Sequence, residues 1–198
     1  MASTKIAAVT ILEASLSPEN KGGDKDLLHT TPNNLRSDLF SFLLKCEVKR
    51  SLRYQNFMTL LILEPDRRPQ SLETLETLAT LIRNSIRETD FMTRIDDAEF
   101  AIVLLESNLD GAYIIASRIV DHISSYRFDH EEVQYLTVSI GGACFPTTSP
   151  SLETSDLLKQ AKNALKIAKK ERNRVHLPGL PVSQPLENRV EDCSAFLF

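Results

Sequence analysis

Apolar positions along residues 35–177 alternate between the spacing of helices and the spacing of strands. Apolar residues at helical spacing predict helices over residues 38–53, 71–86, 110–124 and 156–172. Short apolar or alternating runs predict strands over residues 58–63, 92–95, 99–105, 135–143 and 175–177. Elements of these lengths, in this order, predict a single α/β (α+β) domain in which helices flank one sheet of about five strands.

The two ends of the chain lack this periodicity. Residues 15–34 collect Ser, Pro, Asn, Gly, Lys and Asp, a composition that buries too little apolar surface to offset the entropy of ordering. We therefore expect a flexible N-terminal arm over residues 1–34, a folded domain over residues 35–178 and a C-terminal tail over residues 179–198. The tail ends in Phe196-Leu197-Phe198, which is expected either to dock on a partner or to fray.

Composition and charge narrow the classes of function. The 198 residues are 42% hydrophobic and carry a net charge of −4, which gives the chain as a whole no electrostatic reason to bind DNA, RNA or an anionic membrane. Cys46, Cys144 and Cys193 lack the spacing of a zinc site or a disulfide framework, which favours a reducing, cytoplasmic setting. The apolar stretch at residues 6–12 is too short to cross a bilayer. We expect a cytoplasmic protein with no nucleic-acid polymer as partner and no membrane insertion.

The candidate chemistry lies at the turn between the second and third predicted strands. The sequence there is Arg94-Ile95-Asp96-Asp97-Ala98-Glu99-Phe100, and Arg87-Glu88-Thr89-Asp90 stands just upstream. Over residues 35–177 the chain resembles the GGDEF family, the diguanylate cyclases, whose central hairpin this is. The resemblance implies a nucleotidyl-cyclase-palm type of fold with a mostly antiparallel sheet. The run Val138-Ser139-Ile140-Gly141 is similar to a further strand of the family and supports the fold, not an activity.

The catalytic half of the family motif is altered in this chain. Asp96 and Asp97 occupy the two glycine positions and Ala98 the position of a metal-binding acid, while Glu99 and Phe100 match. Glycines let the backbone approach a triphosphate, whereas two aspartates add like charge there. We therefore expect no catalytic residue and no metal or cofactor at this hairpin, which is interpreted as the remnant of an active site.

Two further segments support the loss of GTP chemistry. Glu64-Pro65-Asp66 stands where the family carries its first metal-binding strand end, but Arg67-Arg68-Pro69-Gln70 then leads directly into the next helix, so the loop that reads guanine is deleted. In the last predicted helix Lys162 replaces an Asp of the family. Lys169 and Arg172 could face a triphosphate in an active enzyme, but a cationic helix end that complements the helix dipole is the simpler explanation.

The regulatory half of the motif matches the family. Arg87 and Asp90 stand at the spacing of its inhibitory, product-binding Arg-x-x-Asp site, the I-site, and Arg118 aligns with a second arginine of that site. An arginine fork pairs with guanine O6 and N7, and a carboxylate accepts hydrogen bonds from the guanine N1–H and amino groups. Arg50 aligns with an arginine that in some members reaches the ligand from a neighbouring domain or subunit.

The resemblance therefore implies a catalytically inactive receptor that binds cyclic di-GMP through Arg87, Asp90 and Arg118, with Arg50 as a further candidate, and that signals to a protein partner. A ligand that also binds Arg50 of a second copy would bridge a homodimer. Such receptors in the family often govern exopolysaccharide export, biofilm formation or motility, and the sequence names no pathway. Two alternatives stay open: a ligand-free interaction module with the same fold, and an active diguanylate cyclase. Taken alone, Arg87 and Asp90 could equally form a solvent-exposed ion pair at a helix end.

Overall fold

The computed structural model describes residues 33–129, 134–146 and 154–179. Nearly all of the expected arm over residues 1–34, and the tail from residue 180 onward, lie outside the described residues.

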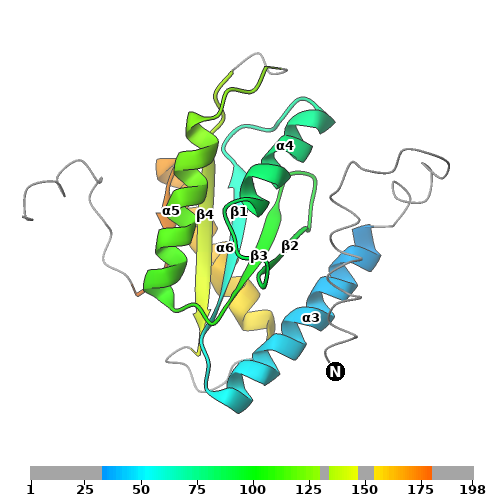
Figure 1. Cartoon of the computed structure of the whole chain (residues 1–198), viewed down its shortest axis with the longest axis vertical. Coiled ribbons are helices and arrows are strands. Elements are labelled where there is room, and N and C mark those ends of the chain that lie inside the picture. The colour runs from blue at the N-terminus through cyan, green and yellow to red at the C-terminus, as the bar shows by residue number, and fades with distance from the viewer. Residues whose placement is uncertain (1–32, 130–133, 147–153, 180–198) are drawn as a thin grey trace, which may run out of the picture.

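A five-stranded sheet forms the middle layer of the domain, with the strand order β2-β3-β1-β4-β5 (Figure 1). All neighbouring strands are antiparallel except β4 and β5, which are parallel. The expected mixed fold with a mostly antiparallel sheet of five strands is confirmed. The strands are β1 (Met58–Pro65), β2 (Phe91–Arg94), β3 (Phe100–Leu105), β4 (Val138–Phe145) and β5 (Val175–His176).

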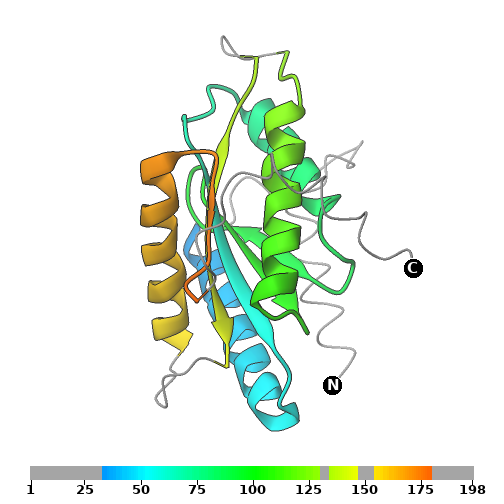
Figure 2. The same cartoon turned by 90° about the vertical axis from the view of Figure 1, so that its left-hand side faces the viewer.

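Helices cover both faces of the sheet. Figure 2 shows α6 on one side of the strands and α5 on the other. The alternation of side chains along β1 divides the core accordingly, because Leu61 and Leu63 pack with α4 and α5 while Leu60 and Ile62 pack with α3 and α6. The described helices are α3 (Asn33–Tyr54), α4 (Leu72–Arg83), α5 (Leu109–Ser125) and α6 (Thr154–Glu171).

Side chains at the helix ends and along the helix faces explain where these elements form. Ser71 caps α4 by accepting a hydrogen bond from Thr74 N, and Asn108 caps α5 by accepting one from Gly111 N. The apolar stripe expected on α5 is buried throughout. Leu52 and Leu72, which the helical pattern placed on buried stripes, are instead 61% and 51% exposed. Each lies within one turn of a helix end, where the core no longer covers that face.

The close contact between α6 and β4 depends on Gly141. A Cβ atom at this position would lie 1.9 Å from the backbone nitrogen of Leu165. Because backbone cannot move aside as a flexible side chain can, only glycine permits α6 to lie this near the sheet. The position of the lysines on α6 is therefore fixed by packing along β4.

Three expected boundaries are corrected by the structure. The first helix begins at Asn33 and not at Asp38. The second helix ends at Arg83 and not at Ile86, because the buried hydroxyl of Ser85 donates to Leu81 O at 2.8 Å and closes the last turn. β4 begins at Val138 and not at Tyr135, which instead forms an isolated bridge with Arg127.

Candidate functional site

The loop between β2 and β3, residues 95–99, is here called the remnant hairpin. It is closed by Ile95 N donating to Glu99 O at 2.8 Å, and Asp97 N donates to the side chain of Asp96 at 2.8 Å. Asp96 and Asp97 are exposed. Ala98 offers only a methyl group where the family resemblance calls for a carboxylate.

Two glutamates, Glu64 and Glu99, lie next to this hairpin. The antiparallel register of β1 and β3 pairs Leu63 with Phe100, which makes Glu64 and Glu99 the next cross-strand neighbours. They line a hollow of about 310 Å³, here called the remnant pocket. Its lining residues are Glu64, Pro65, Asp66, Arg68, Asp96, Asp97, Ala98, Glu99 and Lys169.

Cations of the same chain pair with three of the acids. On α6, Lys162 Nζ lies 3.2 Å from Glu99 Oε1, and Lys169 forms an ion pair with Glu64. Arg68 Nη2 lies 2.5 Å from Asp97 Oδ2, although both of these side chains are mostly exposed. Sequence reasoning noted Lys162 only as a replacement and missed its partner. The signal available was the seven-residue spacing of Lys162 and Lys169, which puts both on one face of a helix.

The carboxylate of Asp66 serves a structural connection. It accepts hydrogen bonds from the hydroxyl groups of Thr137 and Ser139, both at 2.6 Å, and from Asn173 N at 2.9 Å. These contacts join the end of β1 to the start of β4 and to the turn that follows α6. Three donors on one carboxylate leave it little capacity for a metal ion.

Mg²⁺, which the family resemblance implies, does not fit the residues at this site. It requires hard oxygen donors in near-octahedral geometry. Glu64 and Glu99 are paired with lysines and Asp97 with Arg68, Asp96 accepts a hydrogen bond from Asp97 N, Asp66 is held by hydroxyl groups, and Ala98 provides no donor. Within residues 33–129, 134–146 and 154–179, no group of three or more His, Cys, Asp or Glu side chains is placed to hold a metal ion.

The turn between α4 and β2, residues 84–90, is here called the Arg87 turn. Arg118 reaches it from α5, with Nη2 donating to Ser85 O at 2.5 Å. The Ser85 hydroxyl also lies 3.3 Å from His122 Nδ1, one helical turn beyond Arg118. Arg87 and Arg118 are both exposed. The structure thus brings Arg118 to a backbone group two residues from Arg87.

Asp90 is buried at the end of this turn, with 2% of its surface exposed. One carboxylate oxygen accepts from Arg87 N and the other from Leu105 N, each at 3.0 Å. The carboxylate therefore shapes the Arg87 turn and ties it to the end of β3. No ion pair between Arg87 and Asp90 is seen among the described side chains, so the simple explanation of an exposed ion pair is not supported by this geometry.

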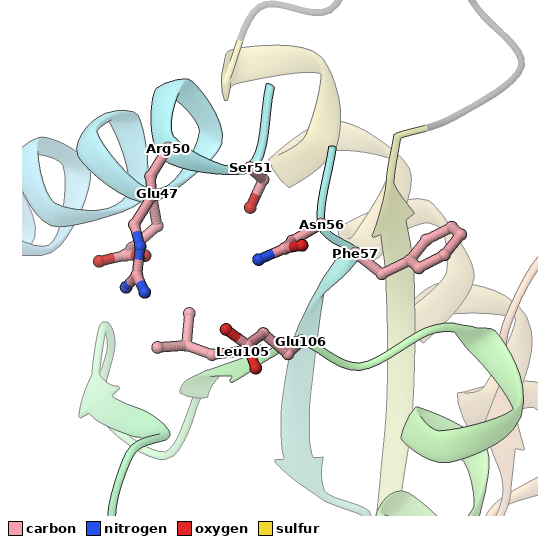
Figure 3. Close-up of a pocket in the computed structure, with 7 residues that line it drawn as sticks. All are labelled: Glu47, Arg50, Ser51, Asn56, Phe57, Leu105 and Glu106. Atoms are coloured by element: carbon pink, nitrogen blue, oxygen red, sulfur yellow. The ribbon is translucent and has the colours of Figure 1, made fainter. Parts of the chain in front are cut away.

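Arg50 lies near the end of α3, above the end of β3 (Figure 3). Its Nη1 lies 3.4 Å from Glu47 Oε2, and Glu47 is buried. Both residues line a small hollow together with Leu105, whose backbone nitrogen binds Asp90. Arg118 is thus tied to the Arg87 turn through Ser85 O, and Asp90 to the end of β3 through Leu105 N, two groups that sequence reasoning did not single out. Arg50 is related to them only by the hollow that it lines with Leu105.

The two cysteines in the described part of the chain are free thiols without features of a reactive or catalytic cysteine. Cys46 is an exposed free thiol on α3, and Cys144 is a partly buried free thiol on β4. Burial raises the pKa of the Cys144 thiol, which keeps it protonated at neutral pH. Cys193 lies outside the described residues.

Comparison with known proteins identifies the family. A family model described as diguanylate cyclase, GGDEF domain, matches residues 72–174, slightly more than half of the chain. This chain belongs to the GGDEF family. The GGDEF domain is 30% identical over 111 residues to the probable diguanylate cyclase DgcT of Escherichia coli K12, a match that covers 54% of this chain and 24% of DgcT. The chain thus spans about a quarter of the length of this relative.

Solved structures agree on the fold. The GGDEF domain of DgcB from Caulobacter crescentus, in complex with c-di-GMP, superposes with a TM-score of 0.63 at 19% identity, covering 71% of this chain and 86% of that one. The diguanylate cyclase SiaD from Pseudomonas aeruginosa, in complex with its activator SiaC, gives a TM-score of 0.64 at 19% identity, covering 89% of this chain and 67% of that one. Among the described helices of the present GGDEF domain, none is long and apolar enough to span a membrane.

Proposed function

We propose that this GGDEF domain is catalytically inactive and acts as a receptor for cyclic di-GMP. Arg87 and Arg118 supply exposed guanidinium groups for the phosphodiester and the guanine edges, and Asp90 belongs to the same site. Arg50 contributes from α3, on this chain or on a second copy bridged by the ligand. The loaded receptor then signals to a protein partner.

The observation that carries the proposal is the hydrogen bond between Arg118 and Ser85 O, which holds the α5 arginine at the turn bearing Arg87. Two guanidinium groups on neighbouring elements suit an anionic, guanine-bearing ligand, because each can pair in a bidentate manner with a phosphate or with guanine O6 and N7. The Arg87 turn is also held in shape before any ligand arrives, since the Asp90 carboxylate accepts from Arg87 N within the turn and from Leu105 N on β3. For the contacts of the two arginines this lowers the entropy lost on binding, whereas contact with the buried Asp90 requires the turn to open.

Asp90 has a double part in this proposal. Its oxygens already accept two backbone hydrogen bonds, and a carboxylate has about four acceptor positions in all. The remaining positions can receive the guanine N1–H and amino groups once the Arg87 turn opens enough to admit the base. Asp90 thus organises the turn first and contacts the ligand second.

The hairpin side of the domain supports the absence of catalysis. The acids that would hold magnesium are paired with Lys162 and Lys169, and Ala98 provides no ligand. Only four residues separate Asp66 from Ser71, the cap of α4, so there is no guanine-reading loop at this point.

Related structures support the classes of ligand and partner. DgcB was solved in complex with c-di-GMP and SiaD in complex with a protein activator. Both share the fold of this chain, which supports a dinucleotide as the class of ligand and a protein as the class of partner.

Titration calorimetry with cyclic di-GMP tests the proposal. We expect Arg87→Ala and Arg118→Ala each to weaken binding about 30-fold, which corresponds to roughly 2 kcal/mol for a lost bidentate contact. Arg127→Ala serves as the matched control, because Arg127 is an exposed arginine beyond the end of α5 that pairs with Asp129 at 3.4 Å.

Absence of heat at high micromolar ligand, or equal affinity in the arginine variants and the control, would contradict the receptor proposal and favour a ligand-free interaction module. Incubation with GTP and Mg²⁺ tests the enzyme alternative separately. A cyclic dinucleotide product would show that the domain is active despite Ala98.

A further inference from the structure

We infer that Lys162 and Lys169 are built-in counter-ions that replace a divalent cation at the remnant pocket, so that the folded domain neither needs nor binds one there. The inference concerns a different part of the domain from the Arg87 turn. It holds whether or not the domain binds cyclic di-GMP.

The first step is the repulsion between Glu64 and Glu99. They are cross-strand neighbours on β1 and at the start of β3, where directly opposed side chains lie about 5 Å apart at Cβ. Like charges in this position destabilise a sheet. Glu99 is the more enclosed of the two, with 15% of its side chain exposed against 38% for Glu64. The pair therefore requires a compensating positive charge.

The second step is the spacing of the lysines on α6. Lys162 and Lys169 are seven residues apart, close to two full turns, so both project from the same face of the helix. Each contacts a different glutamate: Lys162 Nζ lies 3.2 and 3.3 Å from the two oxygens of Glu99, and Lys169 pairs with Glu64. One helix thus supplies two charges to two opposed carboxylates. The closeness of α6 to the sheet, which Gly141 permits, makes these contacts possible.

The third step is competition with a metal ion. A divalent cation would have to displace two tethered ammonium groups from the only two glutamates of the pocket, and then complete its coordination without a carboxylate from residue 98. Asp66 cannot readily substitute, because three donors already bind its carboxylate. Mg²⁺ dehydrates reluctantly and tolerates little departure from octahedral geometry, so the ammonium groups prevail.

Binding of Mn²⁺, followed by electron paramagnetic resonance, provides the test, because Mn²⁺ shares the oxygen-ligand preference of Mg²⁺ and its free form gives a direct signal. The test variant is Lys162→Met with Lys169→Met, which keeps two long apolar stems on the helix. The control is Lys159→Met with Lys166→Met, which removes the same charge at the same spacing from α6 but leaves both lysine–glutamate ion pairs in place.

We expect the wild type and the control to leave Mn²⁺ free at about 1 mM, and the test variant to bind it about tenfold more tightly than either, because two uncompensated carboxylates then face each other. The test variant should also melt at a lower temperature in chelator and recover on addition of Mn²⁺. Adding Glu99→Gln to it should abolish both gains.

Three results would overturn the inference: Mn²⁺ bound by the wild type as tightly as by the test variant, a folded test variant that gains no Mn²⁺ binding, or a gain that survives Glu99→Gln. Should the double variant fail to fold, Lys162→Met alone is measured in the same way. Circular dichroism of each variant separates loss of fold from loss of an ion pair.

Discussion

The remnant pocket and the Arg87 turn treat their charged side chains in opposite ways. At the remnant pocket, Glu64 and Glu99 each meet a lysine from α6. At the Arg87 turn the carboxylate of Asp90 is buried and bound by backbone N–H groups, while Arg87 and Arg118 remain exposed. One region satisfies its charges from within the chain, and the other presents guanidinium groups to solvent.

This difference in charge pairing indicates which of the two regions favours binding of an anion from solution. A polyphosphate at the remnant pocket would meet Asp96 and Asp97 at the hairpin and compete with Glu64 and Glu99 for the lysines. An anion at the Arg87 turn would meet two guanidinium groups. The buried carboxylate of Asp90 is directed at backbone donors, and Glu88, the other acid of the turn, is exposed to solvent. The charges of the two regions therefore favour an anionic ligand at the Arg87 turn over one at the remnant pocket.

The largest expected effect comes from separating α6 from the sheet with Gly141→Ala. The added Cβ would lie 1.9 Å from Leu165 N, so the helix or β4 must shift. Overpacking against backbone should lower the free energy of unfolding by about 3 kcal/mol or more. It should also lengthen the contacts of Lys162 and Lys169 and leave the Arg87 turn intact. Urea unfolding measures the stability loss.

Gly142→Ala is the matched control for this substitution. Its Cβ would meet Leu177 Cδ2 at 2.4 Å and Leu61 Cδ2 at 2.6 Å, which are ends of flexible side chains, and its nearest backbone atom, Leu60 O, would lie at 3.1 Å. We expect a distinctly smaller loss of stability. Equal losses for the two variants would mean that the separation of α6 from β4 is not set by Gly141.

The next largest effect distinguishes the two residues of the Arg-x-x-Asp pair. Asp90→Ala leaves Arg87 N and Leu105 N without their acceptor in a buried position, and it should lower the free energy of unfolding by about 2 kcal/mol. Arg87→Ala removes an exposed side chain and should change stability by less than about 0.5 kcal/mol. Chemical unfolding of the two variants gives both numbers.

Ligand affinity sharpens the same comparison. Both variants should lose cyclic di-GMP binding, but for different reasons, since Asp90→Ala releases the turn and Arg87→Ala removes a contact. Asp90→Asn keeps one acceptor oxygen and should retain part of the stability. A stability loss in Arg87→Ala as large as that in Asp90→Ala would contradict the structural part assigned to the carboxylate.

Much of the fold follows from residue periodicity, because the spacing of apolar residues within one segment is enough to show which face of that helix or strand is buried. Helix α5 buries one apolar stripe and strand β1 buries both of its faces, and both patterns were predicted correctly. Boundaries depended on single side chains. The apolar pattern does not predict that the Ser85 hydroxyl ends α4 before Ile86. It also does not predict that Thr137 and Ser139 donate hydrogen bonds to Asp66 at the start of β4.

For a related reason, the sequence predicted which residues belong to the candidate site but not the contacts that hold them together. The positions of Arg87, Asp90 and Arg118 came from motif spacing, and their ligand contacts stay a prediction. The contacts that join them run through main-chain groups of Ser85 and Leu105, which carry no side-chain signature. The lysine partners of Glu64 and Glu99 lie far away in the sequence: Lys169 is about a hundred residues beyond Glu64, and Lys162 is 63 residues beyond Glu99. Only the packing of α6 on the sheet reveals these pairs.

The smallest effect is expected for Arg68→Ala, the third ion pair of the remnant pocket. Its partner distance of 2.5 Å is shorter than that of Lys162 and Glu99, yet 78% of the Arg68 side chain and 67% of the Asp97 side chain are exposed. Water and salt screen such a pair, and holding two mobile side chains together costs entropy, so the loss of stability should not exceed about 0.5 kcal/mol. Thermal unfolding beside Lys162→Met, whose partner Glu99 is largely enclosed, decides the point. If Arg68→Ala destabilises the domain more than Lys162→Met does, then enclosure of the carboxylate does not govern which pairs matter, and the contrast between the two regions would have to rest on distance alone.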